Sequence, residues 1–416
     1  MNLKKIISSV FLFTFLMNFG YGTNSSFSNN DYSIKNDISK PKESMACLNS
    51  NQKEEKMSID SLKAQSYILT DYKTGQVLYE KNADEKLSIA SITKIMLILL
   101  VVEDIKNEKI SLDELVTVSE NAKPSQKEST LWLEVGEKIT VSDLLKGVIV
   151  NSGNDGARTL AERIAGSEEA CVELMNKRAK ELGMKNTHFM NSSGLDQENS
   201  YSTARDVSIM AKELLKHKWI TNYSSIDTGY IRNGKLLLSN TNKLLKTYKG
   251  CNGLKTGTDT NAGHCLCATA VRNGMHLCAV SLKSESAKDR WHTCSSLLDY
   301  GFNNFQKAPI NYKEIEKKEL AVEKGKNKTV GCMFEDKSDY LIKKTNLRGI
   351  KKEVKFKEEL KAPIKKGDVV GDFIVKNSDG KQLFKLNIVA DEDVEKLSFW
   401  DVFSNIFMNF FGGVEN

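Results

Sequence analysis

The chain has 416 residues, of which 40% are hydrophobic and 27% are charged. This length and composition predict a folded protein of two or three domains with a sizeable core, and they exclude a wholly disordered chain. The formal net charge of +6 comes from scattered lysines, without the dense basic patch and interleaved aromatic side chains of a nucleic-acid-binding protein. We therefore expect no nucleic-acid partner.

The N-terminal segment has the pattern of a secretory signal peptide. Two lysines precede an apolar run over residues 6–19, and two glycines follow it as the small residues before a cleavage site after Gly22. We therefore expect residues 1–22 to direct export and then to be removed, with a membrane anchor as the alternative. Residues 23–58 are rich in Ser, Asn, Lys and Glu, which predicts a disordered linker.

A hairpin and a helix open the folded part of the chain. Residues 66–84 alternate apolar and polar side chains on either side of a turn at 73–75, which predicts two antiparallel strands. The stretch SIASITKIMLILL, residues 88–100, predicts a helix whose apolar run ends at Glu103. This run is too short to span a membrane, so we expect a helix of the core.

The middle of the chain changes from a helical to a strand-rich pattern. Residues 112–220 are predicted to be mostly helical. Residues 235–285 are predicted to be mostly strands, with a hairpin turn at Asn273-Gly274. Strands therefore open and close this segment with helices between them. The order predicts an α+β domain over residues 59–307, in which helices cover an antiparallel sheet.

The C-terminal part predicts a second domain and a terminal helix. Residues 308–392 contain short alternating strands and a hairpin turn at Asp379-Gly380, which predicts a small all-β, sandwich-like domain. Residues 393–416 predict an amphipathic helix. Its apolar stripe consists of Phe399, Trp400, Phe403, Ile406, Phe407, Phe410 and Phe411. We expect this helix to lie on a membrane surface, because interfacial helices are rich in Trp and Phe; packing on the β domain is the alternative.

Ser91 and Lys94 put a hydroxyl and an amine on one face of the apolar helix at 88–100. Side chains at i and i+3 are neighbours on a helix, and the surrounding side chains, among them Ile92 and Ile95, are apolar. Burial lowers the pKa of a lysine towards neutrality, and a neutral amine beside a hydroxyl can accept its proton. The pair therefore predicts a serine nucleophile that is activated without a histidine.

Two further motifs follow in chain order. Ser152-Gly153-Asn154 falls in a predicted break between helices, and Lys255-Thr256-Gly257 falls in a predicted strand. The order Ser-x-x-Lys, Ser-x-Asn, Lys-Thr-Gly resembles that of the serine penicillin-binding proteins and β-lactamases. An earlier Lys-Thr-Gly at 73–75 precedes the nucleophile and lies in a hairpin turn, so we assign it no catalytic role.

The resemblance extends beyond the motifs, to the low-molecular-mass D-alanyl-D-alanine carboxypeptidases. It covers residues 60–410 and is carried by SIASITKIM, VIVNSGNDGARTLAERIAGS, NTHFMNSSGL and GLKTGTDTNAGHCLCATA. It implies a penicillin-binding-protein/β-lactamase-like catalytic domain, a small β domain and an amphipathic C-terminal helix. It also implies that the substrates are peptidoglycan stem peptides ending in D-Ala-D-Ala, that β-lactam antibiotics bind, and that no metal or other cofactor is used.

The resemblance also implies the residues that carry out the chemistry. Ser91 would be the nucleophile that accepts the acyl group, and Lys94 would be the general base. Ser152 would relay a proton between the serine, the lysines and the leaving amine. Asn154 would orient the substrate amide and the lysine.

Further residues would bind the substrate, again by resemblance. Lys255 would attract the terminal carboxylate of the substrate through its positive charge, and it would help to keep the nearby catalytic lysine neutral. Thr256, Gly257 and Thr258 would line the substrate strand, with hydroxyl and backbone contacts. The backbone N–H groups of Ser91 and Thr258 would form the oxyanion hole.

Other polar residues are given structural roles. Arg290 matches a family arginine only loosely, and we expect it to be a surface charge. His264 is expected to be a partly buried strand residue, and no histidine lies in the context of a Ser-His-Asp triad. The eight cysteines have irregular spacing, so we expect most of them to be small buried hydrophobic residues, with their redox state left open.

Three alternatives to a carboxypeptidase remain. A β-lactamase has the same three motifs, a DD-endopeptidase uses the same residues on cross-links, and a non-catalytic wall-binding module would keep the fold alone. Ser-Gly-Asn in place of Ser-Asp-Asn, together with the second domain, favours a carboxypeptidase over a β-lactamase. The signal peptide and the terminal helix predict export to the outer face of the cytoplasmic membrane, at the cell wall.

Overall fold

A computed structural model describes most of the chain. The described residues are 59, 61–125, 128–316, 318–337 and 339–411. The predicted signal peptide and linker, residues 1–58, lie outside the described residues and stay predictions.

A five-stranded antiparallel sheet holds the first part of the fold together. Its strands lie in the order β2-β1-β9-β8-β7. They are β1 (Ala64–Asp71), β2 (Val77–Lys81), β7 (Cys251–Asp259), β8 (Gly263–Arg272) and β9 (Met275–Ser284). Ile68 of β1 pairs with Val280 of β9. The first and last strands of this sheet are therefore adjacent in space, although most of the domain lies between them in sequence.

Both hairpins that the sequence predicts for this sheet are confirmed. Strands β1 and β2 are joined through the turn at 73–75, and β8 and β9 through Asn273-Gly274. Asn273 and Gly274 have positive φ angles of 50° and 73°. Two consecutive positive angles are what a type I′ turn requires, and this turn favours Asn-Gly because its twist matches that of the strands.

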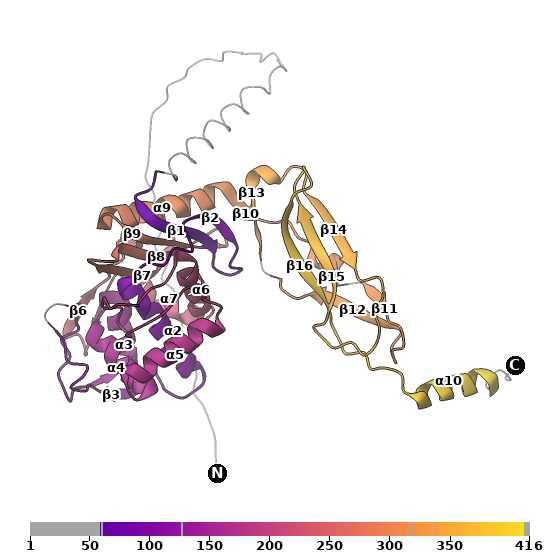
Figure 1. Cartoon of the computed structure of the whole chain (residues 1–416), viewed down its shortest axis with the longest axis horizontal. Coiled ribbons are helices and arrows are strands. Elements are labelled where there is room, and N and C mark those ends of the chain that lie inside the picture. The colour runs from indigo at the N-terminus through magenta and orange to yellow at the C-terminus, as the bar shows by residue number, and fades with distance from the viewer. Residues whose placement is uncertain (1–58, 60, 126–127, 317, 338, 412–416) are drawn as a thin grey trace, which may run out of the picture. The chain divides into compact units, whose positions relative to one another are not determined.

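Helices cover both faces of the sheet, which confirms the predicted α+β class (Figure 1). Helix α9 (Ala287–Asn304) packs on one face, where Leu69 and Leu277 belong to one buried cluster. Helices α2 (Lys94–Lys106) and α6 (Ala204–Leu215) lie on the other face, with Ile68 and Val280 in a larger cluster. The period of two along each strand thus divides its side chains between two cores.

The remaining helices and short strands of this part pack around the sheet, and most of them lie on the α2 side. The helices are α3 (Val141–Lys146), α4 (Asn154–Ala165), α5 (Glu168–Glu181), α7 (Thr221–Ser224) and α8 (Leu244–Thr247). Leu244 of α8 belongs to the cluster on the α9 side. A π-helical turn, η2 (Gly147–Asn151), continues α3, and a 3₁₀ turn, η3 (Lys218–Ile220), precedes α7. Two small hairpins are formed by β3 (Leu115–Thr117) with β4 (Lys138–Thr140) and by β5 (Thr228–Ile231) with β6 (Leu236–Ser239).

The structure corrects two of the predicted element types. Strands β3 and β4 lie within residues 112–220, which were predicted to be mostly helical, and helix α8 lies within the strand-rich region 235–285. These elements have three or four residues each. Such lengths are too short for a hydrophobic period to distinguish a strand from a helix.

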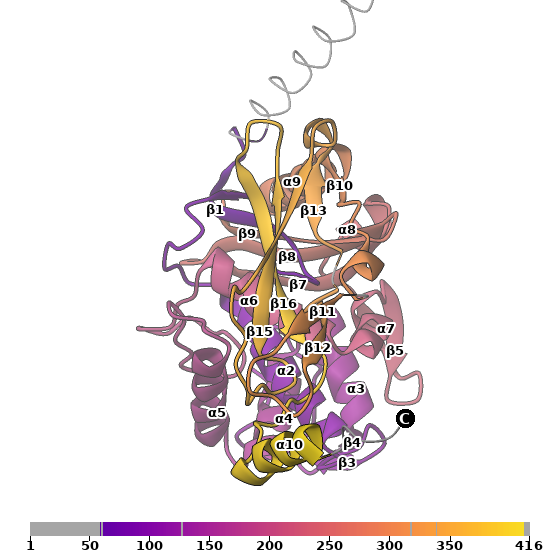
Figure 2. The ribbon, with the colours of Figure 1, turned by 90° about the vertical axis from the view of Figure 1, so that its right-hand side faces the viewer.

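The C-terminal strands form a sheet of their own (Figure 2). Its order is β11-β12-β16-β15-β14, and its pairs are antiparallel. The strands are β11 (Glu319–Ala321), β12 (Thr329–Phe334), β14 (Lys351–Phe356), β15 (Val369–Lys376) and β16 (Gln382–Ala390). The predicted turn at Asp379-Gly380 joins β15 to β16. A short pair, β10 (Phe305–Lys307) with β13 (Leu341–Lys343), and 3₁₀ turns η4 (Tyr312–Glu314) and η5 (Lys344–Asn346) complete this part.

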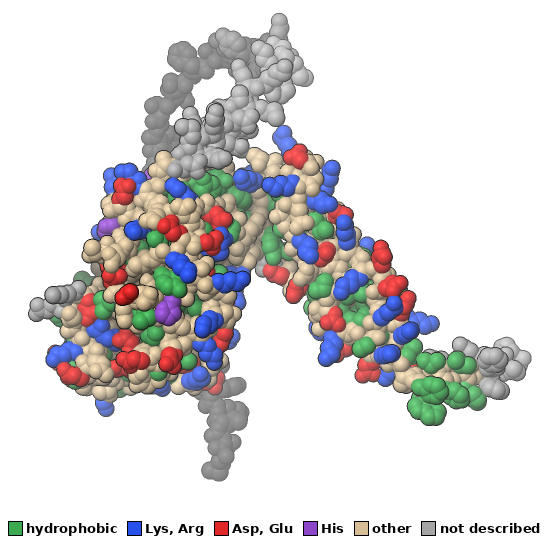
Figure 3. Space-filling view, in the orientation of Figure 1, with side chains coloured by type: hydrophobic (Ala, Val, Ile, Leu, Met, Phe, Trp, Pro, Cys, Tyr) green, Lys and Arg blue, Asp and Glu red, His purple; other side chains and the backbone are tan. Residues whose placement is uncertain are grey.

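The described apolar side chains of the terminal helix α10 (Phe399–Phe411), from Phe399 to Phe407, are exposed and form a green surface in Figure 3. Phe399 is 76% exposed, Trp400 73% and Phe403 52%. These exposed fractions favour attachment to a surface over packing on the β domain, and both stay predictions. Among the described residues, no helix combines the length and the apolar character needed to cross a bilayer.

The contact between α9 and the sheet leads to a first prediction. Gly301 is buried, and a Cβ at this position would lie 2.5 Å from Cδ1 of Leu277 and 3.0 Å from Cδ2 of Leu69. Gly301→Ala should therefore lower the free energy of unfolding by about 1–3 kcal/mol, although alanine is the better helix former. Thermal unfolding beside the exposed control Lys288→Ala would measure this. A rise in stability would mean that the two leucines can move aside.

Candidate active site

Ser91 lies in a 3₁₀ turn, η1 (Ala90–Thr93), that runs directly into α2. In a 3₁₀ turn the side chains at i and i+3 eclipse each other, which brings the Lys94 amine to 2.9 Å from Ser91 Oγ. Ala90 has φ of 46°, a left-handed conformation that is strained for alanine. The sequence predicted the pair but gave no sign of this strain.

The Lys94 amine is fully buried and has three polar contacts. Besides Ser91, it lies 2.6 Å from Asn154 Oδ1 and 2.5 Å from the backbone oxygen of Ser193. Both of these oxygens only accept hydrogen bonds. A neutral amine has two N–H groups and one lone pair. When the two N–H groups bind these oxygens, the lone pair faces the Ser91 hydroxyl, which is the geometry of a general base.

The electrostatic surroundings favour the neutral form of this amine. Burial lowers the pKa of Lys94 well below its usual range, and the positive charge of Lys255 lowers it further. A protonated amine would have to donate its third N–H to Ser91, and it could not accept a proton. The lowered pKa therefore keeps the lone pair available.

A buried ion pair that the sequence analysis did not single out lies behind Asn154. Asn154 Nδ2 donates to Glu128 Oε2 over 2.8 Å. Arg158 donates to both oxygens of the same carboxylate, over 2.7 and 3.1 Å. The Glu128 and Arg158 side chains are 5% and 12% exposed. Asn154 and Arg158 are four residues apart on α4, a spacing that was visible, whereas the position of Glu128 had no sequence signal.

Ser152 occupies the break between η2 and α4, with φ of 64° and 4% exposure. All of Ser152-Gly153-Asn154 is predicted to lie in this break, but Asn154 is the first residue of α4, with Gly153 as its N-cap. A Cβ on Gly153 would lie 2.4 Å from Leu131 Cγ, so the adjacent loop needs a glycine here. The Asp155 carboxylate fixes that loop by accepting hydrogen bonds from the backbone of Leu131 and Leu133.

The Lys-Thr-Gly motif lies on β7, the last strand in the order of the sheet. A Cβ on Gly257 would be 2.5 Å from the backbone oxygen of Ile89, so this glycine lets the strand approach the turn that carries Ser91. Thr256 Oγ1 donates to Thr241 Oγ1 over 2.7 Å. The Thr241 N–H donates to the Val150 oxygen of η2, which links β7 to the Ser-x-Asn motif.

Lys255 is buried in this strand at 1% exposure, and its amine donates to the Thr256 oxygen over 3.0 Å. Burial lowers the pKa of Lys255 to about 7, with a further contribution from the charge of Arg290. At neutral pH this amine is therefore close to its midpoint between the charged and neutral forms.

Arg290 is not the surface charge that we expected. It is 7% exposed, and it donates to Thr258 Oγ1 over 2.7 Å and to the Gly257 oxygen over 3.1 Å. The sequence did not reveal this because Arg290 lies in the first turn of α9, whose polar face could equally have met solvent. His264 is half-buried on β8, opposite Thr258, in agreement with its predicted role.

The cysteines are mostly buried, as predicted. Cys171, Cys265, Cys267, Cys278, Cys294 and Cys332 are buried and Cys251 is half-buried, all as free thiols. Cys47 lies outside the described residues. Within the described part of the chain, no group of three or more His, Cys, Asp or Glu side chains is arranged to hold a metal ion.

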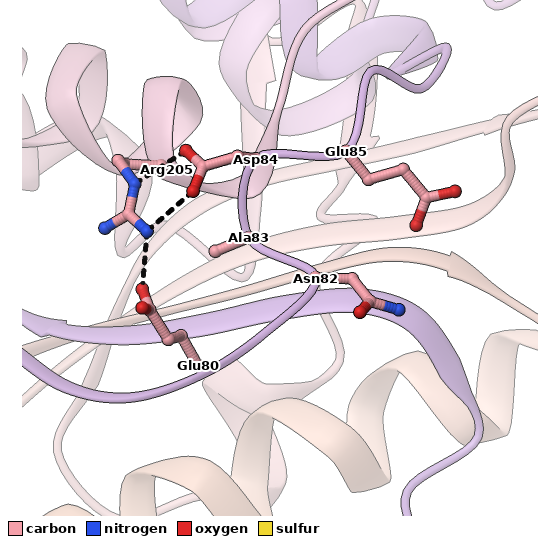
Figure 4. Close-up of a pocket in the computed structure, with 6 residues that line it drawn as sticks. All are labelled: Glu80, Asn82, Ala83, Asp84, Glu85 and Arg205. Atoms are coloured by element: carbon pink, nitrogen blue, oxygen red, sulfur yellow. Dashed lines mark hydrogen bonds and ion pairs between the residues drawn. The ribbon is translucent and has the colours of Figure 1, made fainter.

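A surface pocket away from these motifs is lined by Glu80, Arg205 and residues 82–85 (Figure 4). Arg205 is paired with Asp84 over 2.7 and 2.9 Å and with Glu80 over 2.8 Å. The hydrogen bond with Asp84 raises the pKa of this arginine and lowers that of Asp84. Arg205 is already paired with Glu80 and Asp84, and the lining residues include no nucleophile, so the pocket does not carry the chemistry.

The burial of Lys255 makes stability depend on pH. Folding lowers the pKa of Lys255. The resulting loss of folding stability is therefore complete below about pH 7 and disappears as the pH rises towards the usual pKa of 10.5. Lys255→Met should therefore raise the free energy of unfolding at pH 7 by roughly 2–4 kcal/mol, and the gain should vanish towards pH 10. Thermal unfolding across this pH range, with the exposed Lys185→Met as control, would measure it. A gain independent of pH would contradict the assignment.

Comparison with known proteins agrees with these features. A family model described as D-alanyl-D-alanine carboxypeptidase matches residues 51–286, and a model of the penicillin-binding protein 5 C-terminal domain matches residues 305–396. The chain is 40% identical over 340 residues to D-alanyl-D-alanine carboxypeptidase DacF of Bacillus subtilis, an alignment that covers 81% of this chain and 87% of that protein.

Two solved structures are similar to this one. Penicillin-binding protein 5 from Haemophilus influenzae is 32% identical, with a TM-score of 0.74, and the match covers 81% of this chain and 98% of that one. Penicillin-binding protein D2 from Listeria monocytogenes, in an ampicillin-bound form, is also 32% identical, with a TM-score of 0.54, over 58% of this chain and 98% of that one. The chain therefore belongs to the D-alanyl-D-alanine carboxypeptidase family of penicillin-binding proteins and is a serine-type hydrolase.

Proposed function

We propose that this carboxypeptidase removes the terminal D-alanine of peptidoglycan stem peptides through an acyl-enzyme on Ser91. The observation that supports this is the contact of 2.9 Å between Ser91 Oγ and a buried amine whose other two partners only accept hydrogen bonds. Family membership supplies the reaction class, and this contact supports the assignment of Ser91 as nucleophile and Lys94 as base.

The reaction follows from these groups. Lys94 accepts the Ser91 proton while Oγ bonds to the carbonyl carbon between the two D-alanines. The backbone N–H groups of Ser91 and Thr258 stabilise the oxyanion. The C–N bond then breaks, and the leaving amine takes the proton through Ser152. Water attacks the ester, gives a proton to Lys94 and releases the shortened peptide, and that proton returns to Ser91.

The substrate strand would lie along β7. This strand is at the edge of its sheet, so its outer backbone groups can pair with an extended peptide. The terminal carboxylate would meet the positive charges of Lys255 and Arg290, with the Thr258 hydroxyl between the arginine and the substrate. Thr256, Gly257 and Asn154 would complete the contacts to the peptide.

Acylation of Ser91 gives the central test. Intact-protein mass spectrometry should detect a slowly hydrolysed penicillin adduct, and a peptide ending in D-Ala-D-Ala should lose one D-alanine; Ser91→Ala should abolish both, a loss of at least about 10³-fold. Thr93→Ser, two residues further along the same 3₁₀ turn, is a control. Fast penicillin turnover with an intact peptide would indicate a β-lactamase, and cleavage of cross-linked peptides alone would indicate an endopeptidase.

The chain would act at the cell wall, as its family membership implies. We propose that residues 1–22 direct export, that residues 23–58 act as a linker, and that α10 attaches the enzyme to the outer face of the cytoplasmic membrane. The exposed aromatic side chains of α10 support attachment, and the helix has no Lys or Arg. Attachment would therefore depend on insertion of apolar side chains rather than on attraction to anionic lipids.

We propose a separate role for each domain of the chain. Residues 59–307 would form the catalytic domain, and residues 308–392 would form a domain that separates it from the helix at 393–416. A membrane-bound helix and a stem peptide in the wall lie at different heights above the bilayer, so a rigid domain between them would set the distance at which the enzyme works.

Removal of residues 397–416 tests the attachment. The truncated protein should stay in the supernatant with sedimented liposomes, while the full chain pellets equally with neutral and anionic lipids and at high salt. Phe403→Asp with Phe407→Asp in the full chain should reduce pelleting by about tenfold or more. Both variants should still be acylated by penicillin. Pelleting of the truncated protein would refute attachment through α10.

A further inference from the structure

We propose that the buried Glu128–Arg158 ion pair is the positioning device of the active site: it fixes which end of the Asn154 amide faces Lys94. The inference rests on the proposed function, because it gives the pair a task only if Lys94 is the base. It concerns residues outside the three motifs, and neither Glu128 nor Arg158 would touch the substrate.

Glu128 fixes the orientation of the Asn154 amide. An amide presents an acceptor oxygen on one side and an N–H₂ donor on the other, and its neighbours decide its orientation. The Glu128 carboxylate only accepts, so it holds Nδ2, over 2.8 Å. Oδ1 must then face Lys94, over 2.6 Å.

This orientation decides where the lone pair of Lys94 points. With Oδ1 towards the amine, its two N–H groups go to Asn154 and Ser193, and the lone pair is left for Ser91. A flipped Asn154 would present an N–H₂ donor instead. That donor would compete for the lone pair, and an amine occupied in this way could not take the Ser91 proton.

Arg158 offsets the effect of the Glu128 charge on Lys94. The pKa of Lys94 is lowered by burial and by Lys255, whereas the negative charge of Glu128 raises it, Arg158 lowers it again and Asp155 raises it. A lone carboxylate behind Asn154 would favour the protonated, inactive amine. Arg158 offsets that charge, so the pair orients the amide with little net field on the base.

The pair is not suited to be the base itself. Four groups donate to the Glu128 carboxylate: the Asn154 amide, two N–H groups of Arg158 and the backbone N–H of Ser125. Burial opposes ionisation of Glu128, but the hydrogen bonds from Arg158 and Asn154 outweigh it and lower the pKa of Glu128. An acid with occupied oxygens and a lowered pKa is a poor acceptor for a proton from water.

The test compares the pH dependence of penicillin acylation in full-length variants. In the wild type, acylation falls at acid pH as Lys94 becomes protonated. Glu128→Gln removes a charge that raises the pKa of Lys94, so this acid limb should move to lower pH, and Arg158→Met should move it to higher pH, each by about one unit. Glu128→Gln should also slow acylation roughly tenfold at the pH optimum, because glutamine no longer dictates the amide orientation.

Matched controls come from the same helix. Arg163, also on α4, pairs with Glu114 away from the motifs, so Glu114→Gln and Arg163→Met should leave the acid limb in place. Arg158→Lys keeps the charge and should restore the wild-type limb. Circular dichroism and thermal unfolding would verify that each variant is folded.

Two results would overturn the inference. If both variants slow acylation without opposite shifts of the acid limb, the pair is merely structural. If Glu128→Gln acylates normally but its acyl-enzyme accumulates, Glu128 is a deacylation base. A failure of the proposed function is distinguishable from both, because the wild type itself would then form no adduct on Ser91.

Discussion

The exclusion of water from one amine is the constraint on which this active site depends. Lys94 is completely buried, and an ammonium ion at such a place loses several kcal/mol of solvation. The neutral amine has the lower free energy at this place, and it is also the only state that can accept a proton. The apolar packing of α2 therefore contributes to the reactivity of Lys94, because the fully buried Ile95 and Leu97 keep solvent from the first turn of this helix.

This constraint has a cost in stability. A second buried lysine, Lys255, a left-handed Ala90 and a Ser152 with positive φ all lie in the same small region. Each of them is unfavourable for folding, and each lies in or next to one of the three motifs to which we assign the chemistry. The large core on the α2 side and the long-range pairing of β1 with β9 provide the surplus that such a site needs.

The sequence predicted the parts of the site that depend on local pattern. The Ser91–Lys94 spacing and the strand that carries Lys255 could be predicted because each follows from a helical or strand period. Glu128 and Ser193 could not, because loops far away in the chain bring Glu128 to Asn154 and Ser193 to Lys94. The burial of Arg290 depends on tertiary packing in the same way, and the η1 turn was taken for ordinary helix because both keep i and i+3 together.

The open edge of β7 has a consequence for solubility. In the sheet to which it belongs, β7 has a neighbouring strand on one side only, and it is nine residues long. Unpaired strand edges invite pairing with strands of other molecules, and proteins usually block them with a proline or a bulge. With the substrate along β7, as proposed, that remedy is closed, because a blocked edge would also exclude an extended peptide. We therefore expect the 3₁₀ turn beside Gly257 to limit the pairing of this edge with strands of other molecules.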